Sequence, residues 1–136
     1  QDANKPTWSA FLVIDPVTRD FVLYDTPGLV WNHLHGRDGR TFVSEGRSDL
    51  HFDEAQRAAL EASGLAEHSL REHDLVCRYD VVEGAYRTRA TPLCVSGTSW
   101  KNGTTHPHAV LDHGHTWCYF NSDRDGATRP YRVRMD

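Results

Sequence analysis

The sequence predicts an α+β fold, in which a mainly antiparallel, curved β-sheet carries one short helix packed on it. Three observations support this fold class. Segments rich in β-branched and aromatic residues recur along the chain, turn-forming residues separate them, and only one segment spaces its apolar residues as a helix does. One helix among about six to eight strands fits an open sheet or a half-barrel covered by that helix, and the pattern does not distinguish the two.

The N-terminal third is predicted to form two β-hairpins. Residues 8–14 and 20–24 have strand composition, and they flank a turn in which Pro16 presets the turn φ. Pro27-Gly28 then interrupts the strand pattern. Residues 29–35 and 40–44 form the second predicted pair, because Asp38-Gly39 between them is a strong hairpin-turn signal.

The helix is predicted from Phe52 to Gly64. Acidic residues in its first turn favour the helix dipole, and a glycine suits its C-terminal end. Because its apolar face is mostly alanine, we expect it to pack closely on the sheet. The apolar positions at helical spacing are Phe52, Ala55, Ala59 and Ala62. The remaining strands are expected at 75–82, 85–95, 109–120 and 130–135, with an exposed loop at 96–105.

The chain of 136 residues is expected to form a single globular domain spanning residues 1–136. Its hydrophobic content of 38% and charged content of 25% are typical of a soluble protein. No apolar run approaches the ~20 residues that cross a bilayer, so no membrane partner is expected. A formal net charge of −4 argues against general attraction to nucleic acid, which is therefore expected only as a substrate.

The three cysteines, Cys77, Cys94 and Cys118, show no C-x-x-C spacing, which argues against a zinc finger or a redox pair. If a disulfide forms, Cys94 and Cys118 are the expected pair, because they lie on predicted adjacent strands. Gln1 in place of an initiator Met and the acceptor pattern Asn102-Gly103-Thr104 favour a secreted protein.

Histidine carries the main chemical signal, because six of the nine histidines form three H-x-H pairs. Residues i and i+2 of a strand point to the same face, so each pair can present two imidazoles to one ion or substrate. On an uninterrupted strand, His106, His108 and Asp112 share a face and suit a divalent transition metal such as Zn, Mn, Fe, Cu or Ni. His113 and His115 then lie on the opposite face, unless Gly114 permits a bulge that brings both pairs together.

Two short patterns resemble metal-dependent families. The spacing His106-x-His108-x3-Asp112 is similar to the first motif of cupin barrels, although the second histidine motif is missing. Asp112-His113-Gly114-His115 resembles the core of His-metal-finger nucleases, in which a first-strand His activates water and a later Asn or His helps to hold the metal. Asn121 is available for that role, but a turn follows it in place of the nuclease frame, so neither family is assigned.

Other polar groups suit an anionic substrate. His33 and His35 lie beside Trp31 and just before Arg37, and Arg87 and Arg89 place two guanidinium groups on one face of a strand. Each group also has a simpler interpretation, as a solvated surface residue or as a partner of neighbouring carboxylates. Glu45 and Glu83 are possible general bases or ordinary surface charges.

The sequence therefore predicts a small His-centred hydrolase or lyase that acts on a phosphodiester or another anionic substrate, in a nuclease-like manner. The alternative is a non-catalytic β-rich module that binds a ligand or a metal. The expected partner is a small-molecule or phosphate-containing substrate. The candidate catalytic residues are His113, His115, His33, His35, Arg87 and Arg89, and the candidate metal ligands are His106, His108 and Asp112.

Overall fold

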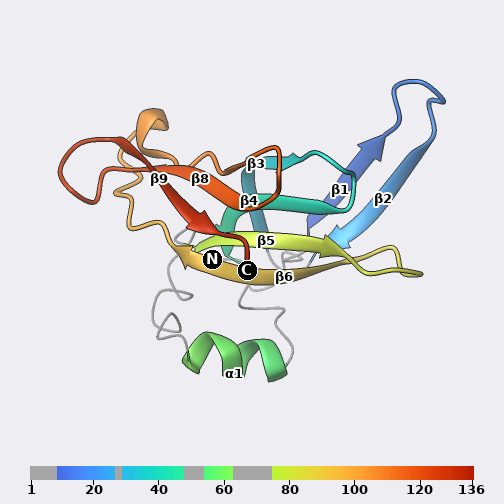
Figure 1. The fold of residues 1–136 in the computed structure, drawn as a ribbon, viewed down its shortest axis with the longest axis horizontal. Coiled ribbons are helices and arrows are strands. Elements are labelled where there is room, and N and C mark those ends of the chain that lie inside the picture. The colour runs from blue at the N-terminus through green and yellow to red at the C-terminus, as the bar shows by residue number, and fades with distance from the viewer. Residues whose placement is uncertain (1–8, 27–28, 48–53, 63–74) are drawn as a thin grey trace, which may run out of the picture.

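The computed structural model describes residues 9–26, 29–47, 54–62 and 75–136. Their strands form three antiparallel sheets, with the orders β1-β2, β3-β4-β5-β6 and β7-β8-β9 (Figure 1). The elements are β1 (Ser9–Ile14), β2 (Phe21–Thr26), β3 (Leu29–Gly36), β4 (Thr41–Arg47), α1 (Glu54–Ala62), β5 (Leu75–Val81), β6 (Thr88–Val95), the 3-10 helix η2 (Gly103–Thr105), β7 (Val110–Leu111), β8 (Trp117–Ser122) and β9 (Arg129–Arg134).

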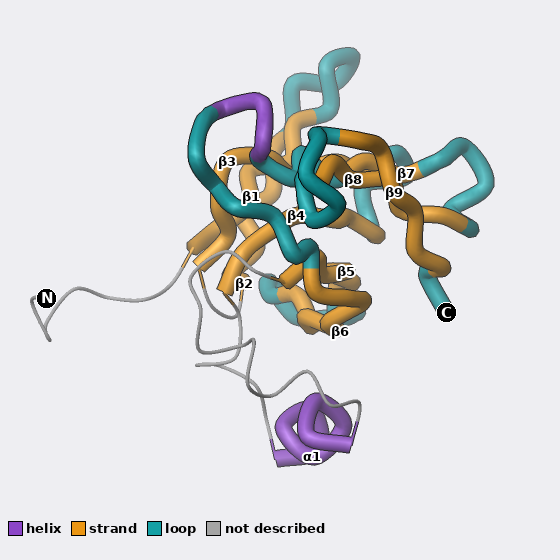
Figure 2. The backbone as a smooth tube through the Cα atoms, turned by 90° about the vertical axis from the view of Figure 1, so that its left-hand side faces the viewer, coloured by secondary structure: helices purple, strands orange, loops and turns teal. Residues whose placement is uncertain are grey.

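The predicted α+β class with a packed helix is wrong, because the fold is mainly antiparallel β. Helix α1 stands apart from the three sheets in both views (Figures 1 and 2), and its side chains Glu54, Ala55 and Ala58 are exposed. The physical reason is that an alanine face removes little apolar surface from water, whereas the sheets bury large side chains against one another. Phe52 and Gly64, the predicted limits of the helix, lie outside the described residues.

Both predicted N-terminal hairpins are confirmed. Strands β1 and β2 pair antiparallel from Ser9–Thr26 to Ile14–Phe21, and β3 and β4 pair across the Asp38-Gly39 turn. Gly39 has a φ of +70°, a left-handed conformation that glycine adopts without steric cost.

No helix among the described residues has the length and apolar character needed to cross a membrane.

The four-stranded sheet is the middle layer of the structure. Phe42 on β4 packs into a cluster with residues of the β1–β2 hairpin, whereas its neighbour Val43 packs on the opposite face against the β7–β9 sheet. Four consecutive β4 residues, Phe42 to Glu45, are therefore buried. Burial on both faces removes the alternation of apolar and polar residues that normally marks an antiparallel strand.

Aromatic rings dominate the core between the hairpin and the middle sheet. Tyr79 is fully buried, and its ring lies 5.6 Å from the Phe11 ring at an interplanar angle of 83°. Phe11 also contacts Phe42, with ring centroids 5.6 Å apart. The edge-to-face arrangement of Tyr79 and Phe11 is a favourable one for aromatic rings.

The core on the other face of the middle sheet joins it to the β7–β9 sheet. Strand β7 packs against β3 and β4, which brings the histidine-rich segment onto the middle sheet. Cys118 and Cys94 both belong to this core, but none of Cys77, Cys94 and Cys118 forms a disulfide in the structure, so the expected Cys94–Cys118 bridge is not formed. Burial, with smaller contributions from Cys94 and Glu45, raises the pKa of the Cys118 thiol to about 12.

Candidate active site at two facing turns

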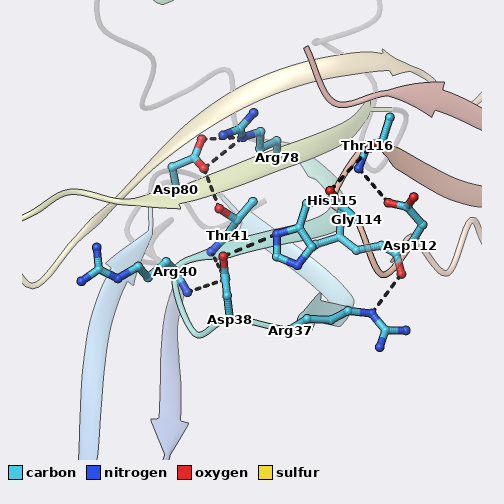
Figure 3. Close-up of polar contacts among 11 residues, drawn as sticks. Arg37, Asp38, Arg40, Thr41, Arg78, Asp80, Asp112, Gly114, His115 and Thr116 are labelled. Atoms are coloured by element: carbon cyan, nitrogen blue, oxygen red, sulfur yellow. Dashed lines mark hydrogen bonds and ion pairs between the residues drawn. The ribbon is translucent and has the colours of Figure 1, made fainter.

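Two turns that are far apart in the sequence, one between β3 and β4 and the other between β7 and β8, face each other (Figure 3). The Leu111 N–H donates to His35 Nδ1 at 3.0 Å, and Arg37 Nε donates to the Leu111 carbonyl at 3.4 Å. His115 Nδ1 lies 3.4 Å from Asp38 Oδ2. The structure therefore brings two candidate catalytic residues, His35 and His115, to one place. Arg37 and the carboxylate of Asp38, which the sequence marked only as a turn residue, lie beside them.

Asp38 builds the first turn and remains able to face His115. Its Oδ1 accepts hydrogen bonds from the Arg40 and Thr41 amides, both at 2.8 Å. Burial raises the pKa of the Asp38 carboxyl, but the amides of Thr41 and Arg40 and the nearby His115 outweigh it, so the net pKa is lowered. The carboxylate is thus ionised near neutral pH, and its second oxygen is directed at the imidazole (Figure 3).

Asp112 builds the second turn in the same way. Its Oδ1 accepts from the Thr116 amide at 2.8 Å and the Trp117 amide at 3.0 Å. The Trp117 amide contributes most to the lowered pKa of Asp112, and burial only partly opposes it. The predicted strand 109–120 is therefore wrong, because β7 ends at Leu111 and β8 begins at Trp117. The shared face argued for His106, His108 and Asp112 required an uninterrupted strand over residues 106–112, of which only Val110–Leu111 is a strand.

His115 is the imidazole best placed for proton transfer. Its side chain is 26% exposed, so it is partly enclosed and still reaches solvent. The ionised Asp38 carboxylate lies on the Nδ1 side of the ring and favours the tautomer with its proton on Nδ1, which leaves the Nε2 lone pair available. A carboxylate that holds the tautomer of a histidine is the arrangement by which many hydrolases prepare a general base.

His35 has the opposite tautomer. Its Nδ1 accepts from the Leu111 N–H, so the proton of the neutral ring is on Nε2. Burial lowers the pKa of His35 most, and the charges of Arg37 and His115 lower it further. His35 is therefore neutral near neutral pH and offers an N–H donor rather than a base.

The stability of the protein should depend on pH through His35. Its folded-state pKa lies below the ordinary 6.5, so the unfolded chain binds more protons in acid. The contribution of His35 to the unfolding free energy is complete above the pKa of this residue in the unfolded chain. It is lost as the pH falls through the pKa of His35 in the folded protein. We expect the wild type to lose more unfolding free energy than His35→Asn between about pH 7 and about pH 5, since the Asn oxygen still accepts from Leu111.

Urea denaturation at several pH values measures this difference. The lowered pKa values of Asp38 and Asp112 start from 3.8, so these carboxyl groups titrate below the window and do not obscure it. Parallel pH profiles for the wild type and His35→Asn would contradict the role assigned to the His35–Leu111 hydrogen bond.

His106 and His108 lie on the loop before β7, apart from the two turns. The His106 ring packs on Trp100 with centroids 4.7 Å apart, and the His106 and His108 rings are 5.8 Å apart at an interplanar angle of 83°. Within the described ranges, no three or more His, Cys, Asp or Glu side chains are grouped as they would be to hold a metal ion. The metal site at His106, His108 and Asp112 therefore stays a prediction.

Glu45 holds the histidine-rich segment to the middle sheet. It is fully buried, and its Oε2 accepts from the Ala109 amide at 3.3 Å. A general base must exchange protons with substrate or solvent, so this burial favours a structural role over the general-base interpretation. Its side chain positions the strand that leads directly into Leu111 and the second turn.

Replacing Glu45 by alanine should lower the unfolding free energy by about 1–3 kcal/mol, because the buried Ala109 amide loses its acceptor. Glu45→Gln keeps an oxygen at that position and should lower the unfolding free energy less than Glu45→Ala does. Chemical denaturation of both variants measures the two effects. Equal destabilisation by Ala and Gln would show that the hydrogen bond to Ala109 is not the important contact.

The remaining candidates do not join this site. His113 is exposed in the second turn, and the side chain of His33 lies outside what the structure describes. Arg87 and Arg89 are exposed at the start of β6, where Arg89 lies across from Asp80. A separate pocket of about 320 Å³ is lined by Arg40, Tyr24 and the 81–86 segment, and no histidine lines it.

No protein-family model, curated protein or solved structure matches this chain.

Proposed function

We propose that this chain is a hydrolase that cleaves a phosphodiester or a similar anionic ester, with His115 as its general base. The contact between His115 Nδ1 and Asp38 Oδ2, at 3.4 Å, is the observation that carries the proposal. It combines an oriented imidazole with partial access to solvent, the two properties that proton transfer to a substrate requires.

In this mechanism His115 Nε2 takes a proton from water as the water oxygen bonds to phosphorus. The bond between phosphorus and the leaving oxygen then breaks on the opposite side of phosphorus. That oxygen takes a proton from solvent, and Nε2 releases its own proton to solvent. Asp38 stays ionised and stabilises the imidazolium that forms between the two steps. The ester and water are the only reactants that this step consumes.

Two neighbouring groups favour an anionic substrate. Arg37 is exposed, and the Leu111 carbonyl anchors its Nε, so its guanidinium lies at the edge of the site. His35 adds a neutral N–H donor whose orientation the Leu111 amide fixes. Donors held in place before the reaction stabilise the charge that develops on phosphate oxygens.

The proposal is tested with bis(4-nitrophenyl) phosphate, with and without EDTA. We expect release of nitrophenol by the purified protein, and we expect the rate to persist after chelation, since the mechanism places no metal in the step. No turnover above buffer would overturn the hydrolase. Turnover that EDTA abolishes, and that His108→Ala also abolishes, would replace the His115 mechanism by a metal site at His106 and His108.

A non-catalytic binding module is the second candidate function. The observation that favours it is an exposed surface of aromatic and arginine side chains on the β7–β9 sheet. Binding to that surface without turnover at the two turns would favour the module over the hydrolase.

A further inference from the structure

The side of the β7–β9 sheet that faces away from the core carries aromatic and arginine side chains. In β8, Cys118, Phe120 and Ser122 are buried, whereas the alternate residues Trp117 and Tyr119 point outward. The same alternation in β9 places Arg132 and Arg134 on the outer side. We call the surface formed by Val110, Trp117, Tyr119, Arg132 and Arg134 the aromatic face.

The strand register brings these residues into two adjacent rows. Tyr119 pairs with Val110 on one side and with Arg132 on the other, and the next outward pair is Trp117 with Arg134. The Arg132 guanidinium lies 4.2 Å from the centre of the Trp117 ring, and that of Arg134 lies 5.7 Å from it. The Arg132 guanidinium therefore covers one side of the Trp117 ring, and the exposed Tyr119 is the stacking surface that lies beside the positive charges.

The two arginines are accessible to an anion. Arg134 pairs with Asp136 through two hydrogen bonds, at 2.7 Å and 2.9 Å, but both side chains are mostly exposed, at 59% and 72%, so solvent and salt screen the pair. Arg132 makes no hydrogen bond or ion pair with any other residue that the structure describes. A phosphate group can therefore replace Asp136 at Arg134 and bind Arg132 directly.

We propose that the aromatic face binds single-stranded nucleic acid. Unpaired bases stack on exposed aromatic rings whatever their sequence, and the phosphates between them pair with the arginines. A duplex hides the base faces, and an acidic peptide lacks a ring to stack on Tyr119. This proposal rests on the proposed function, because the single-stranded nucleic acid would be the substrate class of the hydrolase.

The position of the aromatic face fits that substrate. Trp117 follows His115 by two residues, at the start of β8, so the face begins where the second turn ends. A strand bound along β8 can therefore present a phosphodiester near His115. The net charge of −4 acts against binding, so affinity depends on local contacts and should be sensitive to salt.

Fluorescence anisotropy with a labelled oligothymidylate of twelve nucleotides tests the proposal. We expect Tyr119→Ala to weaken binding by about 5- to 150-fold, the range for loss of one stacked base. Tyr86→Ala is the matched control, because Tyr86 is an exposed tyrosine on another surface and should leave affinity unchanged. Trp117→Ala serves as a second variant, after circular dichroism has verified its fold.

Salt titration adds an independent measurement. Two phosphate contacts predict a slope of log K against log salt of about −1.4, and Arg132→Gln should reduce it by about 0.7. Equal binding of a duplex, equal competition by polyglutamate, or unchanged affinity in Tyr119→Ala would each overturn the proposal. Binding of the oligonucleotide without cleavage would contradict the proposed hydrolase activity alone. Cleavage at the same rate by the wild type and by Tyr119→Ala would contradict only the proposed role of the aromatic face.

Discussion

Replacing His115 by alanine should lower the rate of phosphodiester hydrolysis by at least about 100-fold, the lower end of what a lost general base costs. In the proposed mechanism Nε2 of this ring is the proton acceptor, and the nearby Asp38 carboxylate favours the tautomer that leaves Nε2 unprotonated. Steady-state hydrolysis of bis(4-nitrophenyl) phosphate measures the effect. The residual rate should also lose the rise with pH that a general base imposes on the wild type.

His113→Ala is the matched control, since His113 is an exposed histidine of the same turn. The sequence treated His113 and His115 alike, but only His115 reaches the Asp38 carboxylate. We expect His113→Ala to keep the wild-type rate. Equal losses in the two variants would mean that the turn matters as a whole and that His115 has no special role.

Asp38→Asn tests the orientation of the ring separately from its presence. The amide oxygen can still accept from the Arg40 and Thr41 amides and preserve the turn. The amide nitrogen, however, donates to Nδ1 and imposes the opposite tautomer on His115. Activity should fall while thermal stability changes little, and full activity in Asp38→Asn would remove the carboxylate from the mechanism.

Replacing Tyr79 by alanine should destabilise the fold by about 3–5 kcal/mol, the cost of removing a large aromatic side chain from a core. Tyr79 is fully buried between the middle sheet and the hairpin, and its edge contact with Phe11 is lost with the ring. Total stabilities are about 5–15 kcal/mol, so this one change removes a large part of the total. Guanidinium denaturation measures the difference.

Tyr79→Phe is the control for this core, because it keeps the ring and its contact with Phe11. We expect it to cost much less than the alanine variant. A loss below about 1 kcal/mol in Tyr79→Ala would show that the β1–β2 hairpin contributes little to the fold. Tyr79 lies in the core opposite the β7–β9 sheet, so the folded fraction of Tyr79→Ala should remain active.

Local signals explain why the hairpins could be predicted and the layers could not. Asp38-Gly39 builds its turn from its own side chain and from a positive φ, and both are properties of neighbouring residues. The burial of Phe42 and Val43 on opposite faces requires two other sheets, which no local pattern reveals. The alanine face of α1 had the spacing of a packed helix, but spacing does not provide the apolar area that packing requires.

The histidine-rich segment illustrates the same limit at the site. Parity along a strand assigned Asp112 to the face of His106 and His108, but its carboxylate accepts two amides and ends the strand as a turn. Asp, like Asn and Ser, can satisfy nearby backbone donors, and this local competition interrupts a ladder. The metal prediction for these residues thus lost the geometric premise from which it was derived.

The sequence by itself determined the hairpin turns, the abundance of strands, and the set of imidazole and guanidinium groups available for chemistry. Only the tertiary structure decided which of these groups meet. The His35 ring and the Leu111 amide that binds it are 76 positions apart, and Asp38 meets His115 through the same approach of the two turns. Such contacts arise when sheets bury apolar faces against each other, a long-range free energy that neighbouring residues do not encode.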